Sequence, residues 1–257
     1  MLGTIIADQA SVIKRKTQNP SPDVIVSLAV TDWLLNGDTL DRTDLKAFLA
    51  KWKQKYLPPA TPYSFKNENP ILAAVPIGLW APCPETAFHT ARLVAGTIYP
   101  TKLRIECTEL VAEAVSLAAM KVSKREIKTY LENRYGCDLS FGEKIIQEEK
   151  TPKNLQTVET AIRIFLSENS FRKTLNATAG LDNPLASCIA CGLAEAYHGI
   201  PFLTRRKAFR SLPEDIRKIV KQIQAQDEER RVAQSIARSR SEILNQSRMD
   251  YKRKIAG

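Results

Sequence analysis

The sequence predicts an all-α protein, and three observations support this fold class. Glycine is scarce, with 10 residues in 257, whereas Ala, Leu, Glu, Lys and Arg, which favour helices, are abundant. Apolar stretches such as residues 24–35 are too long for a typical strand. Several such stretches begin at a capping residue or end at Gly or Pro. With 44% hydrophobic residues, the chain can bury a core of its own.

The first predicted helices follow from these signals. Residues 24–35 form a buried helix that Asn36-Gly37 ends. Asp41 or Thr43 caps a second helix through Tyr56, and the prolines that follow stop it. Residues 57–70, with four prolines, are expected to be a loop.

The middle of the chain has clearer boundaries. Residues 85–97 and 106–121 are helical by pattern. Ser123 and Glu126 have the spacing of a capping box, which predicts a helix through Tyr135. Gly136 then terminates that helix.

Further helices are predicted over residues 155–167, 170–177 and 185–197, with a turn over 180–184. The 185–197 segment is nearly uncharged, which indicates a central position in the core. Ser211 and Glu214 predict a capped last helix of the domain. From about residue 222 the apolar residues thin out, so we expect a long polar helix that projects from the body.

The positive charge is concentrated toward the C-terminal end of the chain. Residues 205–257 contain 15 Lys and Arg against 7 Asp and Glu, a net charge of +8 out of a total of +10. We therefore expect a helical domain over residues 1–221 and a basic helical extension over 222–257. A uniformly basic nucleic-acid-binding protein would have a different distribution.

Composition and cysteine content indicate a cytoplasmic protein. The five cysteines are an odd number in a long chain, which is typical of reduced thiols. No run of about 18 apolar residues is present, and the first residues lack the basic region of a signal peptide. No membrane association is expected.

Five segments in order resemble the ADP-ribosylglycohydrolase family. Residues 161–182 run from an alanine-containing helix with Phe-Leu and Ser-Phe pairs into a turn, and residues 190–199 form a small-residue helix ending in Ala-Tyr-His-Gly. Residues 2–10 are similar to the opening helix of the family, Ser21-Pro22-Asp23-Val24 to its Thr-Asp-Asp-Thr segment, and residues 74–78 to its Ala-Pro-Leu-Gly loop.

This resemblance implies a hydrolase that uses two magnesium ions to release ADP-ribose. The family's ligands come from the Thr-Asp-Asp turn and from an Asp-x-Asp-Thr turn, and magnesium requires oxygen ligands. Here Ser21, Asp23 and Asp182 remain, whereas Pro22, Pro184 and Leu185 occupy the other positions. Two of four carboxylates are lost, so we expect no bound metal and no cofactor, with Ser21, Asp23 and Asp182 as remnants of the metal site.

The loop that approaches the ribose and phosphates in the family has also changed. Residues 67–73 lack its two glycines and its arginine, so no small-molecule ligand is expected. A structural interpretation of Asp23 and Asp182 is that each caps the helix that follows it. Asp8 is expected to be solvated or to act as a cap.

Other reactive side chains favour structural roles. Cys188 and Cys191 form a single C-x-x-C pair on a buried helix, and zinc needs four ligands, so both are expected to be small core residues. His89 and His198 are the only histidines, which does not support a catalytic triad.

The basic extension carries the positive prediction of a partner. An acidic protein is the expected partner, and nucleic acid is the alternative, although Tyr251 is the only aromatic residue there. The predicted partner-binding residues are Arg230, Arg231, Arg238, Arg240, Arg248, Lys252, Arg253 and Lys254.

Three functions follow from these observations. The first is a catalytically inactive relative of the ADP-ribosylglycohydrolases that acts as a binding or scaffold protein through its basic C-terminal helix. The second is a divergent hydrolase of ADP-ribose conjugates that uses one metal ion or none. The third is a nucleic-acid-binding protein, whose affinity would fall steeply with salt.

Overall fold

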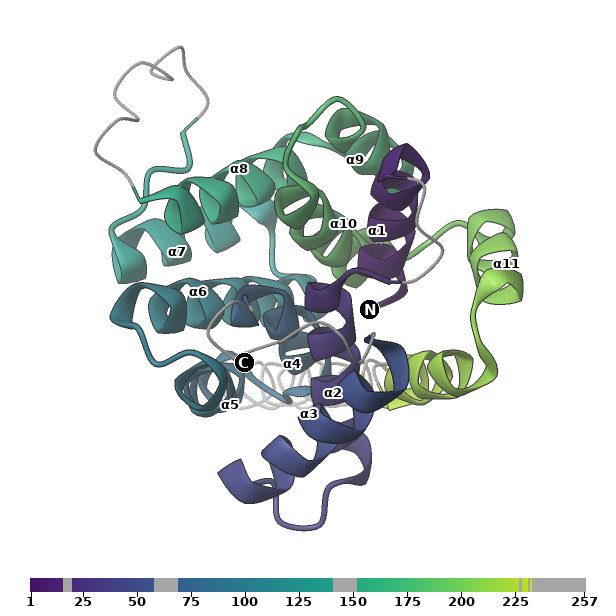
Figure 1. Ribbon diagram of the computed structural model, residues 1–257. Helices are drawn as coiled ribbons and strands as arrows, with labels where there is room; N and C mark the ends of the chain where they lie inside the picture. The colour runs from purple at the N-terminus through teal and green to yellow at the C-terminus, as the bar shows by residue number, and fades with distance from the viewer. Residues whose placement is uncertain (16–19, 58–68, 141–151, 227, 231, 233–257) are drawn as a thin grey trace, which may run out of the picture.

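A computed structural model describes residues 1–15, 20–57, 69–140, 152–226, 228–230 and 232. Across these ranges the chain is helical and contains no strand, which confirms the all-α prediction. No described helix is long and apolar enough to cross a bilayer. Figure 1 shows the arrangement of α1 (Leu2–Arg15), α2 (Pro22–Asn36), α3 (Arg42–Tyr56), η2 (Pro70–Ala73), α4 (Ala74–Trp80), α5 (Pro84–Ile98), α6 (Lys102–Ala119), α7 (Lys124–Tyr135), α8 (Lys153–Ser167), α9 (Phe171–Thr178), α10 (Pro184–His198) and α11 (Phe202–Ser211).

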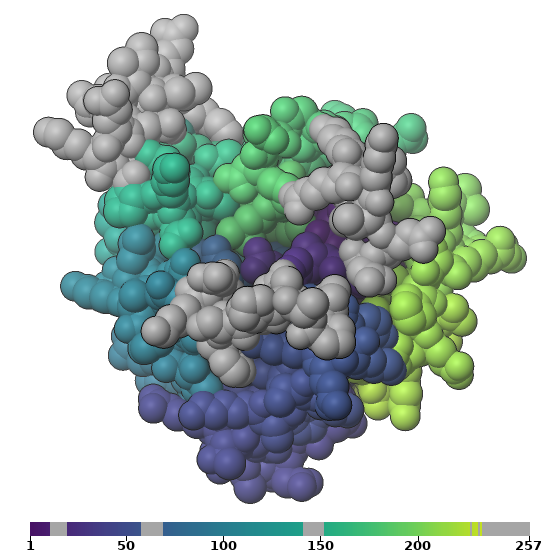
Figure 2. Space-filling view, viewed as in Figure 1, coloured from purple at the N-terminus to yellow at the C-terminus, as the bar shows by residue number. Residues whose placement is uncertain are grey.

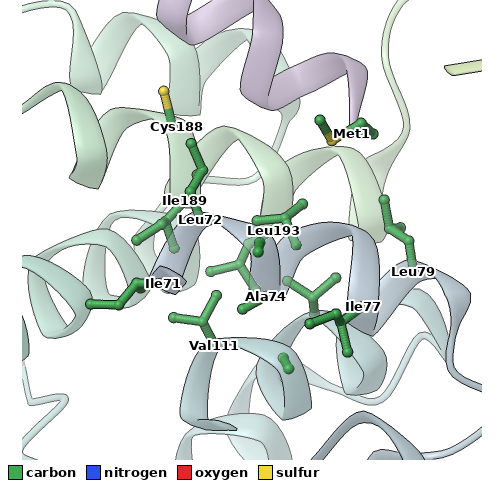
Figure 3. Packing of buried hydrophobic residues seen from close by; sticks show 14 of the residues in the cluster. Met1, Ile71, Leu72, Ala74, Ile77, Leu79, Val111, Cys188, Ile189 and Leu193 are labelled. Atoms are coloured by element: carbon green, nitrogen blue, oxygen red, sulfur yellow. The ribbon is translucent and has the colours of Figure 1, made fainter. Parts of the chain in front are cut away.

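Three helices are buried on nearly all sides and form the centre of the molecule. Every residue of α2 from Val24 to Leu34 is buried, as is every residue of α6 from Cys107 to Ala119. In α10 the buried residues run from Ala186 to Ala196. A helix that is apolar on all faces needs neighbours on all faces, and the other helices supply them. Figure 3 shows the core where η2, α4, α6, α10 and the start of α1 meet.

Helix α1 lies against α10 at a distance that only small residues allow. A Cβ on Gly3 would lie 2.5 Å from the carbonyl oxygen of Cys191, and one on Gly192 would lie 3.0 Å from Thr4 Oγ1. The Thr4 hydroxyl donates to the carbonyl oxygen of Cys188 at 3.3 Å across the same contact. The absent side chains therefore let the two helices approach closely.

The helix boundaries confirm most of the predicted caps. Asp41 accepts hydrogen bonds from the amides of Thr43 and Asp44 at 2.8 and 2.9 Å and so caps α3. Ser123 and Glu126 form the capping box of α7. Gly136 ends α7 with a φ of 65°, in the left-handed region that glycine adopts at little cost.

Two segments differ from the prediction. Residues 70–80 form η2 and α4 rather than a loop around 74–78, because their apolar side chains are almost all buried among α2 and α6. Ser211 does not cap the next helix. It ends α11, a helix that the sequence reasoning missed, and its hydroxyl donates to the carbonyl oxygen of Ala208 at 2.8 Å.

The last described helix begins at residue 214 and continues to 226 without a break at 222. Ile219, Val220 and Ile223 are buried on the body, so this helix belongs to the core as far as Ile223. Helix α11 lies at the edge of the molecule beside α1, and only its Ala208 is buried.

Candidate functional site

Asp8 and Ser21 are joined at the entrance to α2. Asp8 is only 2% exposed, and its Oδ2 atom accepts a hydrogen bond from the Ser21 amide at 3.0 Å. The expectation of a solvated Asp8 is therefore wrong. Ser21 is the N-cap residue of α2, but its hydroxyl makes no capping bond. Asp8 thus fixes the chain where it enters α2.

Asp23 lies in the first turn of α2. Its Oδ1 atom accepts from the amide of Asn69 at 3.4 Å, and the side chain of Asn69 in turn accepts from the Ile71 amide at 3.2 Å. The structural interpretation expected Asp23 to cap α2, but the N-cap residue of α2 is Ser21. Asp23 contacts the segment that leads into η2, where the resemblance places the ligand loop of the family.

Asp182 lies in the turn between α9 and α10 and is exposed. The N-cap of α10 is Asn183, whose side chain accepts from the Ala186 amide at 3.1 Å, so the expected capping role of Asp182 is wrong. Asp182 instead lines a pocket of about 420 Å³ with Ala7, Ala10 and small residues of α9 and α10.

In each of the two turns where the resemblance places metal ligands, a proline occupies the first position of a helix. Pro22 begins α2 and Pro184 begins α10. Proline suits this position because its fixed φ matches the helix and no amide donor is needed there. Neither supplies an oxygen ligand from its side chain. Among the described residues, no three His, Cys, Asp or Glu side chains are grouped so that they could hold a metal ion. The side chains at the two turns therefore do not fit a pair of magnesium ions.

Glu195 is the most highly connected buried carboxylate in this region. It is 7% exposed and accepts from the Met1 amino group at 2.5 Å, the Gly3 amide at 2.7 Å and the Leu2 amide at 3.2 Å. Gln224 Nε2 adds a fourth bond at 3.3 Å. A carboxylate at a helix N-terminus also interacts favourably with the helix dipole. Glu195 thereby ties α10 to α1 and to the last described helix.

Two further buried glutamates on α6 hold arginines. Glu113 is fully buried and accepts from Tyr130 Oη at 2.8 Å, from Arg134 Nε at 2.8 Å and from Tyr135 Oη. Glu109 accepts from Arg92 Nε at 2.6 Å; burial raises its pKa and the hydrogen bond from Arg92 opposes that rise. The sequence signal for Glu109, Glu113 and Glu195 was an acid within an apolar helix, but its partners were not predictable.

The arginines and Glu109 line a pocket away from those two turns. That pocket measures about 440 Å³, and Cys107 forms part of its wall. Burial raises the pKa of Cys107 to about 12, so this thiol is not a nucleophile at neutral pH.

Another pocket, of about 560 Å³, lies between α2, α3 and the last helix. Asp32 in its wall accepts from Trp52 Nε1 at 2.8 Å and from Lys51 Nζ at 3.1 Å. Asp215 accepts from Tyr56 Oη at 2.7 Å and from Lys55 Nζ at 2.5 Å. These ion pairs join α3 to its neighbours, which is a structural role.

His198 ends α10 beside two lysines that bind helix carbonyls. Lys124 Nζ donates to the carbonyl oxygen of Phe165 at 2.6 Å, and Lys121 Nζ donates to that of Ala196 at 2.9 Å. Burial and the nearby charge of Lys124 lower the pKa of His198 below its ordinary value of 6.5. The Nε2 atom of His198 is buried without a hydrogen-bond partner. His198 therefore favours the neutral form. His89 is exposed on α5, away from these residues.

Cys188 and Cys191 are buried in α10, as expected, and neither forms a disulfide. Burial raises the pKa of Cys191 to about 12. The Sγ atom of Cys191 is 3.9 Å from Thr178 Oγ1, a weak polar contact within the core. Both thiols act as small apolar side chains.

Of the predicted partner-binding residues, only Arg230 has a described side chain. Its Nη1 atom donates to the carbonyl oxygen of Ala81, just after α4, so this guanidinium contacts the body. The other seven lie outside the described residues; they are Arg231, Arg238, Arg240, Arg248, Lys252, Arg253 and Lys254.

The sequence model of the ADP-ribosylglycohydrolase family matches residues 6–245, nearly the whole chain. No curated protein matches the chain.

Proposed function

Because this chain belongs to the ADP-ribosylglycohydrolase family, we propose that it is a member that does not hydrolyse ADP-ribose conjugates and serves as a binding or scaffold protein. The observation that carries the proposal is the pair of prolines at the first positions of α2 and α10. They stand where the resemblance places magnesium-binding carboxylates. In both turns, a proline that begins a helix stands at the position of a metal-binding carboxylate.

The remaining carboxylates support the same proposal. Asp8 and Asp23 each accept a hydrogen bond from a main-chain amide, so part of their acceptor capacity already serves the fold. Asp182 is exposed in the wall of a pocket whose other side chains are mostly small or apolar. A pair of divalent cations needs several converging carboxylates to offset their mutual repulsion. The donor set here is too small for that.

Isothermal titration of ADP-ribose into the full chain, with millimolar magnesium and again with a chelator, tests the proposal. We expect no metal-dependent heat. A hydrolytically active family member is the positive control. Micromolar binding that requires magnesium contradicts the proposal.

The alternative, a divergent hydrolase, makes a different prediction. It requires turnover of ADP-ribosylated arginine, ADP-ribosylated serine or O-acetyl-ADP-ribose. This turnover should be lost in Asp182→Ala, while the unfolding curve stays unchanged. Because Asp182 is exposed, this substitution should leave the fold intact. Absence of turnover in the unsubstituted chain favours the binding protein.

We further propose that the partner is an acidic protein and that the basic residues after position 230 contribute to its binding. The support is the charge of residues 231–257, which contain 7 Lys and Arg against 2 Asp and Glu, a net charge of +5. Affinity of the full chain for poly-glutamate should fall when the seven basic residues from Arg231 to Lys254 named above are replaced by glutamine. Tighter binding to duplex DNA, with a steep dependence on salt, favours the nucleic-acid alternative instead.

A further inference from the structure

Helix α11 has an outward face that no part of the described structure covers. Phe202 is 63% exposed and Leu203 is 76% exposed, and among the described residues these two and Val232 are the large hydrophobic side chains most open to solvent. The helix is attached to the body mainly through Ala208, with Phe209 partly buried beside it. In Figure 2 the α11 region, coloured yellow-green, forms the right-hand edge of the molecule.

The same helix is strongly cationic. Arg205, Arg206, Lys207 and Arg210 are all exposed, and α11 contains no acidic residue. Within the described part of the chain, none of these four cations takes part in an ion pair. This contrasts with Lys55 and Arg92, which pair with Asp215 and Glu109. The positive charge of α11 is therefore not needed to balance charges of the fold.

Helical geometry places the apolar and cationic side chains on one face. Residues three and four apart are neighbours on a helix, so Phe202, Arg206 and Arg210 lie in one row. Leu203 lies three residues before Arg206 and seven before Arg210, on the same side of the helix. Thr204 and Ala208, also four apart, face the body. The outward face thus offers apolar contact in its first turn and two guanidinium groups for carboxylates in the turns that follow.

We propose that this face of α11, formed by Phe202, Leu203, Arg206 and Arg210, binds an acidic amphipathic segment of a partner protein. The carboxylates of the segment would pair with the two arginines, and its apolar side chains would cover Phe202 and Leu203. Arginine suits this role because its guanidinium binds carboxylates through two hydrogen bonds.

Two other classes of macromolecule fit the face less well. A helix that lies in a lipid interface has an apolar face along its length, whereas the exposed apolar side chains of α11 are confined to its first two residues, Phe202 and Leu203. Single-stranded nucleic acid would stack on several aromatic rings, but Phe202 is the only exposed ring of α11, because Phe209 packs against the core. An acidic protein segment uses all four side chains.

This surface is distinct from the basic residues after position 230, so the inference goes beyond the proposed function. It is tested by selecting peptides of about 16 residues, long enough to cover a helix of this length, from a random display library on the full chain. The enriched peptides are then titrated against three full-chain variants. One carries Phe202→Ser and Leu203→Ser, and one carries Arg206→Glu and Arg210→Glu. The third, a control, carries Arg172→Glu and Lys173→Glu, at two exposed basic residues of α9.

We expect enriched peptides that combine Asp or Glu with apolar residues, and an affinity about tenfold or more lower for each α11 variant. The α9 control should bind as the unsubstituted chain does. The α11 positions are exposed, so unchanged unfolding curves are expected and exclude loss of fold as the cause.

Three results overturn the inference. The first is no enrichment, or enrichment of peptides without acidic residues. The second is peptide binding that neither α11 variant weakens, which contradicts the role of α11 without bearing on the proposed function. The third is that the chain binds vesicles rich in phosphatidylserine, or single-stranded DNA, with higher affinity than it binds the peptides, and that this binding is lost in the α11 variants.

Discussion

Removing the carboxylate of Glu195 should be the most damaging single change on α10. In Glu195→Ala, the fully buried Met1 amino group loses its ion pair, and the amides of Leu2 and Gly3 lose their acceptor. Breaking a buried ion pair by removing one partner costs about 3–5 kcal/mol. Each orphaned buried donor costs about 1–3 kcal/mol, a penalty that overlaps with the first rather than adding to it. We therefore expect the free energy of unfolding to fall by about 3–5 kcal/mol.

Glu195→Gln separates charge from hydrogen bonding. The amide oxygen can still accept from α1, so the expected loss is smaller, about 2 kcal/mol. Glu106→Ala on α6 is the matched control, because Glu106 forms only an exposed i,i+4 pair with Lys102 at 3.8 Å. Its expected cost is about 0.3–0.5 kcal/mol. Urea unfolding followed by circular dichroism measures all three variants.

The result that refutes this reasoning is a loss below about 1 kcal/mol for Glu195→Ala, within the range of an ordinary surface change. A double-mutant cycle with Gln224→Ala adds a second check. Gln224 donates to Glu195 at 3.3 Å, so the two costs should be non-additive. Additive costs contradict a direct bond between the last helix and α10.

Further predictions concern packing, capping and pH. Gly78→Ala should lower the free energy of unfolding by about 1–3 kcal/mol, because its Cβ would lie 2.5 Å from the carbonyl oxygen of Ala112. A Cβ on Gly96 would meet nothing within 4 Å, so Gly96→Ala should raise the free energy of unfolding by about 0.5–1 kcal/mol. Urea unfolding midpoints compare the two variants. Ser123→Ala removes the capping box of α7 and should cost about 1 kcal/mol by the same measurement, and an unchanged midpoint contradicts this. The pKa of His198 is lowered in the folded state, so as the pH falls through 6.5 the unfolded chain binds a proton before the folded chain does. The stability contributed by neutral His198 is therefore complete above pH 6.5. It is lost as the pH falls through the folded-state pKa. Unfolding free energies measured from pH 5 to 8 should show a slope of at most about 1.4 kcal/mol per pH unit from this group, and His198→Phe should remove it; a slope that persists assigns the effect elsewhere.

Local signals predicted the helices well because the groups that decide a helix end are close in sequence. Asp41, Ser123 and Gly136 act on neighbours within four residues, and all three do what their positions predict. Helix α11 was missed because its short, basic sequence has almost no buried face to give a periodic pattern. Ser211 was misplaced for a related reason, since its hydroxyl binds the helix before it instead of capping the helix after it.

The turns before α2 and α10 show where prediction from the sequence stops. That Pro22 and Pro184 offer no side-chain oxygen can be read from the sequence, but the hydrogen bonds of the nearby acids cannot. Asp8 and Asp23 bind amides 13 and 46 residues away. The capping role expected of Asp182 belongs to Asn183, one residue later, because only the backbone geometry of the turn decides which side chain reaches the Ala186 amide.

The contact between α1 and α10 also sets an order of events during translation. The Met1–Glu195 pair spans 194 positions of the chain. A ribosome adds about 5–20 residues per second, so α1 waits roughly 10–40 s before α10 has been synthesised. During that time Leu2 and Ile5, both buried in the folded protein, have no α10 to cover them. The nascent chain therefore presents an apolar helix from the start, and a ribosome-bound chaperone that covers α1 should raise the yield of folded protein.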